Sequence, residues 1–440
     1  MTVPREDWEN YLDSLAVFGM RPGLERVSAL LGALGWPQDR FRVIHVVGTN
    51  GKSSTTRFAA ALLQAHGLHA GAYLSPHITG YCERVLVDGE PVDTGQFGRA
   101  VRRVRDEVSG LSAELGETTQ FEVLTVAALL AMAESGVEAV ALEAGLGGRL
   151  DATNVVRAPV VALTNIALEH TEVLGDTRAA IFVEKAAVIK GGDAVFGPLD
   201  GLEGAAEEVC ARAGARAHLL GRDFAFEGEP GDFRVRTAAA TYVGLALSSP
   251  ARYQVVNAAL AVTAVDLLLG ALDVDIVRAA LRSVVVPGRL QIVSRDPLLL
   301  ADGAHNPDGV RALVGTLSGM RLRRPVVAVI AVLRDKDAEG MLRTLLPSVD
   351  AVVCTQAREP RSLSADELAR RMSAVTAQPQ APGAGEKGGG AATVAHVAED
   401  PHRAVAQARA LAGPGGTVVV TGSLYLLEDL RDLLGGADHT

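Results

Sequence analysis

The chain has 440 residues, of which 48% are hydrophobic and 21% charged, and its formal net charge at pH 7 is −10. This length and composition predict a globular protein of two or three domains. No apolar run approaches the ~18 residues of a membrane span, and the charged first ten residues lack a signal-peptide core, so we expect a cytoplasmic protein without a membrane partner. The negative charge argues against nucleic acid as the main partner, so an anionic ligand would need a local positive site or a metal ion.

The first half of the chain alternates between strand-like and helix-like patterns. Such alternation predicts βαβ units and a mostly parallel sheet. Short alternating runs with Gly and Pro over residues 224–247 predict a small β-hairpin, and a helix should follow over 256–269. The other expected strands are 42–47, 70–74, 139–142 and 160–164, with helices at 121–135 and 182–190.

A break at Val286-Pro287-Gly288-Arg289 precedes a second α/β pattern. We therefore predict two α/β domains. Residues 1–286 should form a P-loop ATPase-like domain with a mostly parallel sheet, and residues 287–440 a smaller Rossmann-like domain. The Pro- and Gly-rich residues 378–391 predict a mobile loop of low complexity. The strands expected in the second domain are 298–301, 326–331, 351–355, 393–396 and 418–421.

The segment Gly48-Thr49-Asn50-Gly51-Lys52-Ser53 lies between an apolar strand pattern and a helix pattern. A Gly-rich turn ending in Gly-Lys-Ser in this context is typical of a phosphate-binding loop. Backbone N–H groups and the positive end of the helix would hold phosphate oxygens, and Lys52 adds a full charge. Val46 replaces the first Gly of the common eight-residue pattern, so the alternative is an ordinary strand–helix turn.

Polar residues follow three other predicted strands. Ser75 follows one strand, Glu143 another, and Glu169 with His170 comes shortly after a third. Ligands of open α/β sheets bind at the carboxyl ends of the strands, so these groups should converge beside the phosphates. They could hold Mg²⁺ bridging the phosphates of ATP. Taken singly, each has an alternative: Ser75 as a turn residue, Glu143 as an ion-pair partner, and His170 as a structural histidine.

Motifs along nearly the whole chain resemble the folylpolyglutamate synthase/dihydrofolate synthase family of Mur-ligase-like ATP-dependent amide ligases. The run from Gly145 to Asn154, Gly-Leu-Gly-Gly-Arg-Leu-Asp-Ala-Thr-Asn, is the most specific, since it separates this family from the cell-wall Mur ligases. The other matching segments are 11–15, 23–26, 48–53, 75–77, 83–84, 121–122, 169–170, 174–177, 184–186, 287–289, 302–307, 335–337 and 421–425.

The resemblance implies that Lys52 contacts the β- and γ-phosphates of ATP. Ser75 and Glu143 would ligate one Mg²⁺, and His170 a second. Lys185 matches a lysine that can be carbamylated, which would convert a group without acceptors into an anionic oxygen ligand. The alternative is an unmodified Lys185 that contacts a phosphate or Glu184. The implied ATP-binding residues of the loop are Gly48, Thr49, Asn50, Gly51, Lys52, Ser53 and Ser54.

Other matching positions imply the rest of the site. Arg289, Asp302 and His305 of the second domain would hold ATP together with Asn257 of the first, although Asp302 and His305 could equally cap a loop at the Asn-Pro turn signal. Three positions are expected on the folate side: Phe121 and Asp151 near the pteridine, and Arg84 at a substrate carboxylate. Two departures matter. Either Ser53 or Ser54 could face the metal, and Tyr253 stands where the family usually has His.

The implied reaction is ATP-dependent ligation of L-glutamate to dihydropteroate or to the glutamyl tail of a reduced folate, through an acyl phosphate. No protein nucleophile is needed, and positioning with charge neutralisation suffices. We expect a monomer acting on small molecules. The alternatives are a superfamily ligase for another acid or amino acid, a P-loop kinase or nucleotide-binding regulator, and an inactive homologue that only binds ligands.

Overall fold

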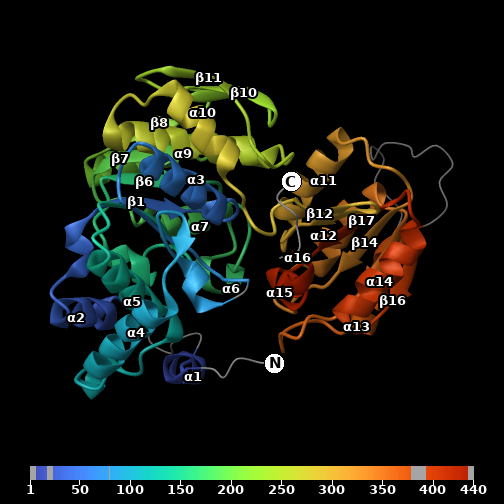
Figure 1. The fold of residues 1–440 in the computed structure, drawn as a ribbon, viewed down its shortest axis with the longest axis horizontal. Coiled ribbons are helices and arrows are strands. Elements are labelled where there is room, and N and C mark those ends of the chain that lie inside the picture. Colours follow the sequence, from blue (N-terminus) through green and yellow to red (C-terminus); the bar gives the residue numbers. More distant parts are fainter. Residues whose placement is uncertain (1–5, 17–22, 79, 378–392, 435–440) are drawn as a thin grey trace. The chain divides into compact units, whose positions relative to one another are not determined.

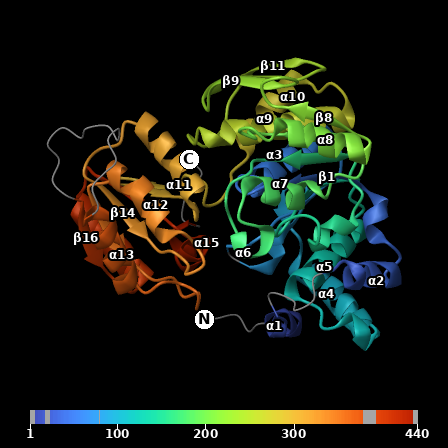
Figure 2. The same ribbon diagram turned by 180° about the vertical axis from the view of Figure 1, so that it is seen from behind.

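The computed structural model describes residues 6–16, 23–78, 80–377 and 393–434 (Figures 1 and 2). Within these ranges the chain forms two compact units. The first unit consists of the described residues up to Ser248 together with Gln254–Val284. The second consists of Ser249–Tyr253 and the described residues from Val285 onward. The short segment Ser249–Tyr253 was not foreseen as part of the second unit. The low-complexity loop predicted over 378–391 lies outside the described residues.

An eight-stranded sheet with the order β4-β3-β2-β5-β1-β6-β7-β8 forms the centre of the first unit. Neighbours from β2 to β8 pair in parallel, and β3 and β4 add antiparallel pairs at one edge. The mostly parallel sheet is therefore confirmed. Its strands are β1 (Arg42–Val47), β2 (Ala70–Tyr73), β3 (Val85–Val87), β4 (Glu90–Pro91), β5 (Ala139–Glu143), β6 (Val160–Leu163), β7 (Gly192–Phe196) and β8 (Ala215–Leu219).

Helices pack on the central sheet because its strands are apolar on both sides. Val43 and Val47 of β1 join one large core, whereas Ile44 and Val46 point to the opposite face, where α3 (Lys52–Ala65) contacts β1, β2, β5 and α10 (Val274–Ser283). The helices that contribute to the large core are α1 (Asp7–Ser14), α2 (Glu25–Ala33), α4 (Thr94–Val108), α5 (Gln120–Glu134), α6 (Thr171–Leu174), α7 (Arg178–Ala186) and α8 (Glu203–Ala213).

Three predicted elements of the first unit need correction, and one of them is the helix expected over 256–269, which begins earlier, at Tyr253. The hairpin expected over 224–247 is a three-stranded antiparallel sheet of β9 (Ala225–Glu229), β10 (Asp232–Arg236) and β11 (Thr241–Leu245), since the segment contains two turns rather than one. The helix expected over 182–190 is α7 (Arg178–Ala186). It begins four residues earlier because the Thr177 hydroxyl accepts a hydrogen bond from the backbone N–H of Ala180 and caps it.

The helix α9 (Tyr253–Leu269) is buried almost all round, as expected for an apolar sequence without a polar face. Its first residue belongs to the second unit and the remainder to the first. Within the described part of the chain, no helix is long and apolar enough to cross a membrane.

The second unit contains a six-stranded sheet with the order β12-β13-β17-β14-β15-β16, parallel except for β12 with β13. Its strands are β12 (Gln291–Arg295), β13 (Leu298–Ala301), β14 (Val326–Ile330), β15 (Ala351–Cys354), β16 (Val394–Val397) and β17 (Thr417–Thr421). One face carries α11 (Pro307–Gly319), α12 (Ala338–Leu345) and α13 (Ala365–Ala377), and the other carries α14 (Pro401–Ala412) and α15 (Leu424–Asp429).

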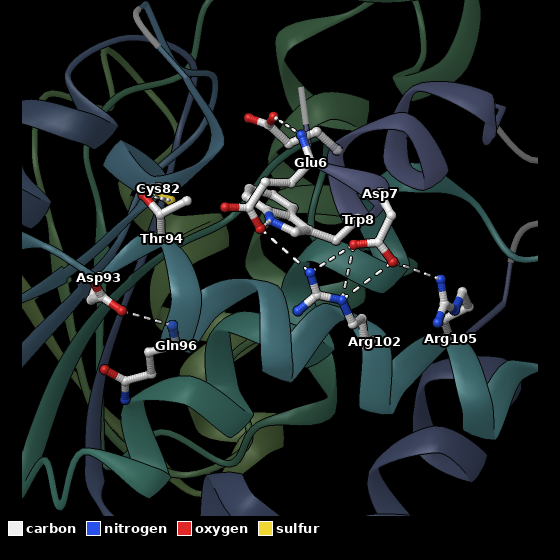
Figure 3. A network of polar contacts seen from close by, with 10 residues as sticks. Glu6, Asp7, Trp8, Cys82, Asp93, Thr94, Gln96, Arg102 and Arg105 are labelled. Carbon is white, nitrogen blue, oxygen red and sulfur yellow. Dashed lines mark hydrogen bonds and ion pairs between the residues drawn. The ribbon is translucent and has the colours of Figure 1, made fainter. Parts of the chain in front are cut away.

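Ion pairs fasten helix α1 to helix α4 (Figure 3). The Asp7 carboxylate accepts hydrogen bonds from Arg102, 2.6 Å away, and pairs with Arg105; its pKa lies below the usual value chiefly because of the Arg102 hydrogen bond. Farther along the chain, Asp13 accepts a 2.6 Å hydrogen bond from the Tyr81 hydroxyl. The helix α1 therefore also holds the 3-10 segment Tyr81–Arg84.

Candidate active site

The predicted phosphate loop connects β1 to α3. Strand β1 ends at Val47, and α3 begins at Lys52. Gly51 has a φ of 83°, and a Cβ placed there would lie 2.3 Å from the Asn257 side-chain oxygen. Only glycine fits both the left-handed backbone and this close approach. The structure thus brings Asn257 of α9 to the predicted loop.

Two residues at the end of β6 support the loop and were missed from the sequence. The Thr164 hydroxyl donates a 2.6 Å hydrogen bond to the Asn50 carbonyl, and the Asn165 side-chain oxygen accepts one of 2.9 Å from the Asn50 N–H. The Asn165 carbonyl accepts a further 3.0 Å hydrogen bond from the Thr49 N–H. Since β6 is a direct neighbour of β1, its carboxyl end was the signal that could have identified them.

Two lysine amines meet at the first carbonyl of the loop. The Lys52 amine donates to the carbonyls of Gly48 and Thr49, at 3.2 and 3.1 Å, and the Lys185 amine donates to Gly48 at 2.7 Å. Burial and, to a smaller extent, the nearby charge of Lys52 together lower the pKa of Lys185 to about 7. Glu184 pairs with Arg149 at 3.0 Å. A large share of Lys185 is therefore neutral near pH 7.

This neutral amine makes stability depend on pH in a definite direction. Between about pH 7 and the ordinary value of 10.5 the unfolded chain binds a proton at Lys185 that the folded chain lacks. The free energy of unfolding should therefore rise with pH in this window, by at most about 1.4 kcal/mol per pH unit. In urea unfolding at several pH values in CO₂-depleted buffer, Lys185→Met should remove this slope. An identical slope in the two proteins would contradict a neutral Lys185.

Glu143, the last residue of β5, lies beside the first turn of α3. Its side chain is buried, its Oε1 accepts a 2.9 Å hydrogen bond from the Ser53 hydroxyl, and its Oε2 accepts one of 3.1 Å from the Ser75 N–H. The Ser54 hydroxyl is buried and has no hydrogen-bond partner among the described residues. The side chain that faces Glu143 is therefore that of Ser53 rather than that of Ser54.

The oxygens around Glu143 are of the kind that Mg²⁺ prefers. The Glu143 carboxylate of β5, the Ser53 hydroxyl of α3 and the Ser75 backbone N–H after β2 lie within one hydrogen-bonded group. In the described ranges, however, no group of three or more His, Cys, Asp or Glu side chains could hold a metal ion alone. A cation at this place would therefore complete its coordination with hydroxyls, phosphate oxygens or water.

His170 lies at the start of the short helix α6 (Thr171–Leu174), in a left-handed backbone conformation with a φ of 50°. Its Nε2 is 4.0 Å from the nearer carboxylate oxygen of Glu169, and about one third of its side chain is exposed. The imidazole therefore has an acidic neighbour and access to solvent.

The predicted folate-side residues have three different environments. The Phe121 ring lies against Gly145, where a Cβ would come within 2.4 Å of the ring. Any side chain at position 145 would therefore clash with Phe121. Asp151 caps the turn after it: its carboxylate accepts from the N–H groups of Leu146, at 2.7 Å, and Thr153, at 3.0 Å. Burial raises the pKa of Asp151. Arg84 is buried and donates to His77 at 2.7 Å.

In the second unit, Asp302 follows β13 and organises the loop before α11. Its Oδ2 accepts hydrogen bonds from the Tyr253 hydroxyl, at 2.5 Å, and the Leu290 N–H, at 2.9 Å. Its Oδ1 accepts from the Ala304 N–H at 2.9 Å. The His305 Nδ1 lies 2.9 Å from the Gly303 carbonyl, and a Cβ at Gly303 would be 3.0 Å from an Arg289 nitrogen. The structure therefore brings Arg289, Asp302 and His305 together in one loop region.

Two family models match this chain: the Mur ligase middle domain over residues 46–196, and the Mur ligase glutamate ligase domain over residues 288–424. The fold and the loop thus define an ATP-dependent ligase of the Mur type.

Relatives over most of the chain narrow the class further. A dihydrofolate synthase/folylpolyglutamate synthase of Mycobacterium tuberculosis is 36% identical over 79% of this chain and 77% of its own length. Folylpolyglutamate synthase of the same organism, solved with ADP, has a TM-score of 0.89 and 32% identity over 97% of both chains. The bifunctional enzyme of Yersinia pestis, solved with AMPPNP and a Mn ion, has a TM-score of 0.84 and 32% identity over 97% of both chains. The chain belongs to the dihydrofolate synthase/folylpolyglutamate synthase family.

Proposed function

We propose that this chain joins L-glutamate to dihydropteroate, to the glutamyl tail of a reduced folate, or to both, at the expense of ATP. The observation that carries the proposal is the loop after β1, where the Lys52 and Lys185 amines share the Gly48 carbonyl and Ser53 contacts Glu143. Family membership supplies the class of substrates, since the relatives are named for both reactions.

The reaction proceeds by two transfers. An oxygen of the acid substrate's carboxylate attacks the γ-phosphorus of ATP; the new P–O bond forms as the bond to the β-phosphate oxygen breaks, and ADP departs. The amine of L-glutamate then attacks the acyl carbon, phosphate leaves with the oxygen that carried it, and the nitrogen loses a proton. The chain contributes positioning and compensation of charge rather than a covalent bond.

The proposed nucleotide site has two parts. In the first unit, the backbone N–H groups of residues 51–54 at the start of α3 hold the phosphates, while those of Thr49 and Asn50 donate to Asn165 and fix the loop. Lys52 offsets the charge of the phosphates, and Asn257 lies beside the loop. In the second unit, Arg289, Asp302 and His305 form the other part. We expect each part to contribute to ATP binding.

Magnesium is the proposed cofactor, and when bound it would withdraw negative charge from the phosphate groups of ATP. Glu143 and Ser75 would hold one ion and His170 a second. The solved relative with AMPPNP and a Mn ion supports a divalent cation in this family. Lys185 could join as a carbamate, and its lowered pKa favours the neutral amine that reacts with CO₂.

On the acid side, we propose that the Phe121 ring and the loop capped by Asp151 contact the pteridine, and that Arg84 contacts a carboxylate. Support comes from the close packing of the half-buried Phe121 ring against Gly145 and from the His77–Arg84 hydrogen bond, which fixes the guanidinium. We also propose a monomeric cytoplasmic enzyme whose partners are small molecules, consistent with its net charge of −10.

The test is phosphate release by the purified protein with MgATP and L-glutamate, with dihydropteroate or tetrahydrofolate in separate reactions. Product masses should show one added glutamate. Release with both acceptors would establish two activities, and release with one would name the physiological step. If folded, ATP-binding protein released no more phosphate with either acceptor than without one, a ligase for another acid would replace this proposal.

A further inference from the structure

We propose that Tyr253 is a positioning residue for nucleotide binding, because its phenol fixes the orientation of the Asp302 carboxylate. This inference rests on the proposed role of Asp302 in holding ATP. It adds a residue that the family resemblance left without a role, since Tyr253 stands where His is usual.

The first support is the way in which Tyr253 is held. It is the first residue of α9, and it packs with the core of the second unit. The preceding residues are anchored there as well: Ala251 is fully buried, and the Arg252 N–H donates to the Thr316 hydroxyl at 3.3 Å. Because this segment is already held in place, the Tyr253 side chain loses little further conformational entropy when its hydroxyl forms a hydrogen bond.

The second support is the division of donors around Asp302. Two backbone N–H groups, of Leu290 and Ala304, each reach one carboxylate oxygen, and the Tyr253 hydroxyl is the third donor, at 2.5 Å. Burial and the charge of Asp302 raise the pKa of Tyr253 well above its usual value, so the phenol stays protonated and donates. Hydrogen bonds to a charged, buried acceptor are the stronger kind and are directional.

The third support is the neighbourhood. Arg289 and His305 both lie near Gly303, the residue that follows Asp302 in the chain. Without the phenol, the Asp302 carboxylate would keep two donors, the Leu290 N–H at Oδ2 and the Ala304 N–H at Oδ1, so its orientation would be less restrained. A less restrained carboxylate presents a less defined acceptor geometry to a nucleotide.

The matched experiment compares Tyr253→Phe with Tyr242→Phe in the full-length protein. Tyr242 makes the same kind of bond, a buried phenol donating to Asp266 Oδ1 at 2.7 Å, but in the first unit and away from the proposed site. Tyr253→Phe should raise the KM for ATP and the Kd for ADP about 10-fold while leaving kcat and the KM for glutamate within about 2-fold. Tyr242→Phe should leave all four values unchanged.

A purely structural role for Tyr253 would give a different result. Both variants would then lower the midpoint of thermal unfolding, and neither would change the Kd for ADP; that outcome overturns the proposal. The proposal is also overturned if Tyr253→Phe weakens the binding of glutamate and the binding of nucleotide by the same factor. ADP binding by calorimetry needs no acid substrate, so it still tests Tyr253 if the proposed acceptors prove wrong.

A double-mutant cycle with Asp302→Asn tests whether the phenol acts through the Asp302 carboxylate. If the phenol acts through Asp302, adding Tyr253→Phe to Asp302→Asn should change the Kd for ADP by less than about 2-fold. Additive losses in the cycle would show that Tyr253 acts by another route and would overturn the inference.

Discussion

Replacing Lys52 by alanine should lower kcat by on the order of 10²–10³-fold and leave the fold intact. The amine lies at the first turn of α3 and, among the described residues, donates to the Gly48 and Thr49 carbonyls alone, so its charge is available to a phosphate held by the loop. Its loss removes compensation for negative charge that grows on the γ-phosphate. Steady-state phosphate release measures kcat, and circular dichroism with thermal unfolding tests the fold.

Lys190→Ala is the control for Lys52. The Lys190 amine also donates to backbone carbonyls of the first unit, but to those of Asn154 and Val156 rather than to carbonyls of the loop. This variant should lose stability rather than turnover. Full activity in Lys52→Ala would rule out the loop as the phosphate site, and equal losses of kcat in both variants would mean that a general loss of structure is being measured.

The second large effect is expected for Glu143→Gln, which should reduce turnover by on the order of 100-fold at low Mg²⁺ and raise the Mg²⁺ concentration needed for half-maximal activity. The amide keeps the shape of the side chain but removes its charge. It also places an NH₂ group toward either the Ser75 N–H or the Ser53 hydroxyl, where Glu143 now accepts. Activity measured across a Mg²⁺ titration separates cation binding from the chemical step.

Glu184→Gln is the matched control, because Glu184 is a surface acid on α7 that pairs with Arg149. Surface pairs of this kind contribute little, so both turnover and Mg²⁺ dependence should stay close to those of the wild type. An unchanged Mg²⁺ curve in Glu143→Gln would contradict the assignment of Glu143 as a metal ligand.

Much of the fold could be predicted because the buried strands are apolar and rich in β-branched residues. Strand β1 has the predicted bounds, and β13 does as well. The missed strand β12 is half-exposed along its length and lies at a sheet edge, so it lacks a continuous apolar signal. The number of strands in the small sheet β9–β11 was underestimated, because its two closely spaced turns look like one irregular stretch in the sequence.

The sequence could predict only those site residues that follow a strand at the carboxyl edge of the parallel sheet. The rule that ligands bind at strand ends led to Ser75 and Glu143, and the structure joins them by a hydrogen bond. It could not separate Ser53 from Ser54, since a single residue turns the side chain by about 100° around a helix. The link between Tyr253 and Asp302 spans 49 residues and carries no local pattern, so only the folded chain reveals it.

The discontinuity of the second unit limits how the protein can be divided. A fragment that begins at Val285 lacks Ala251, which fills its core, and Tyr253, which binds Asp302. Such a fragment would carry an empty space and a carboxylate short of one donor, so conventional truncation at the boundary would yield a weakened product. Isolating this half therefore requires joining Ser249–Tyr253 to it through a linker.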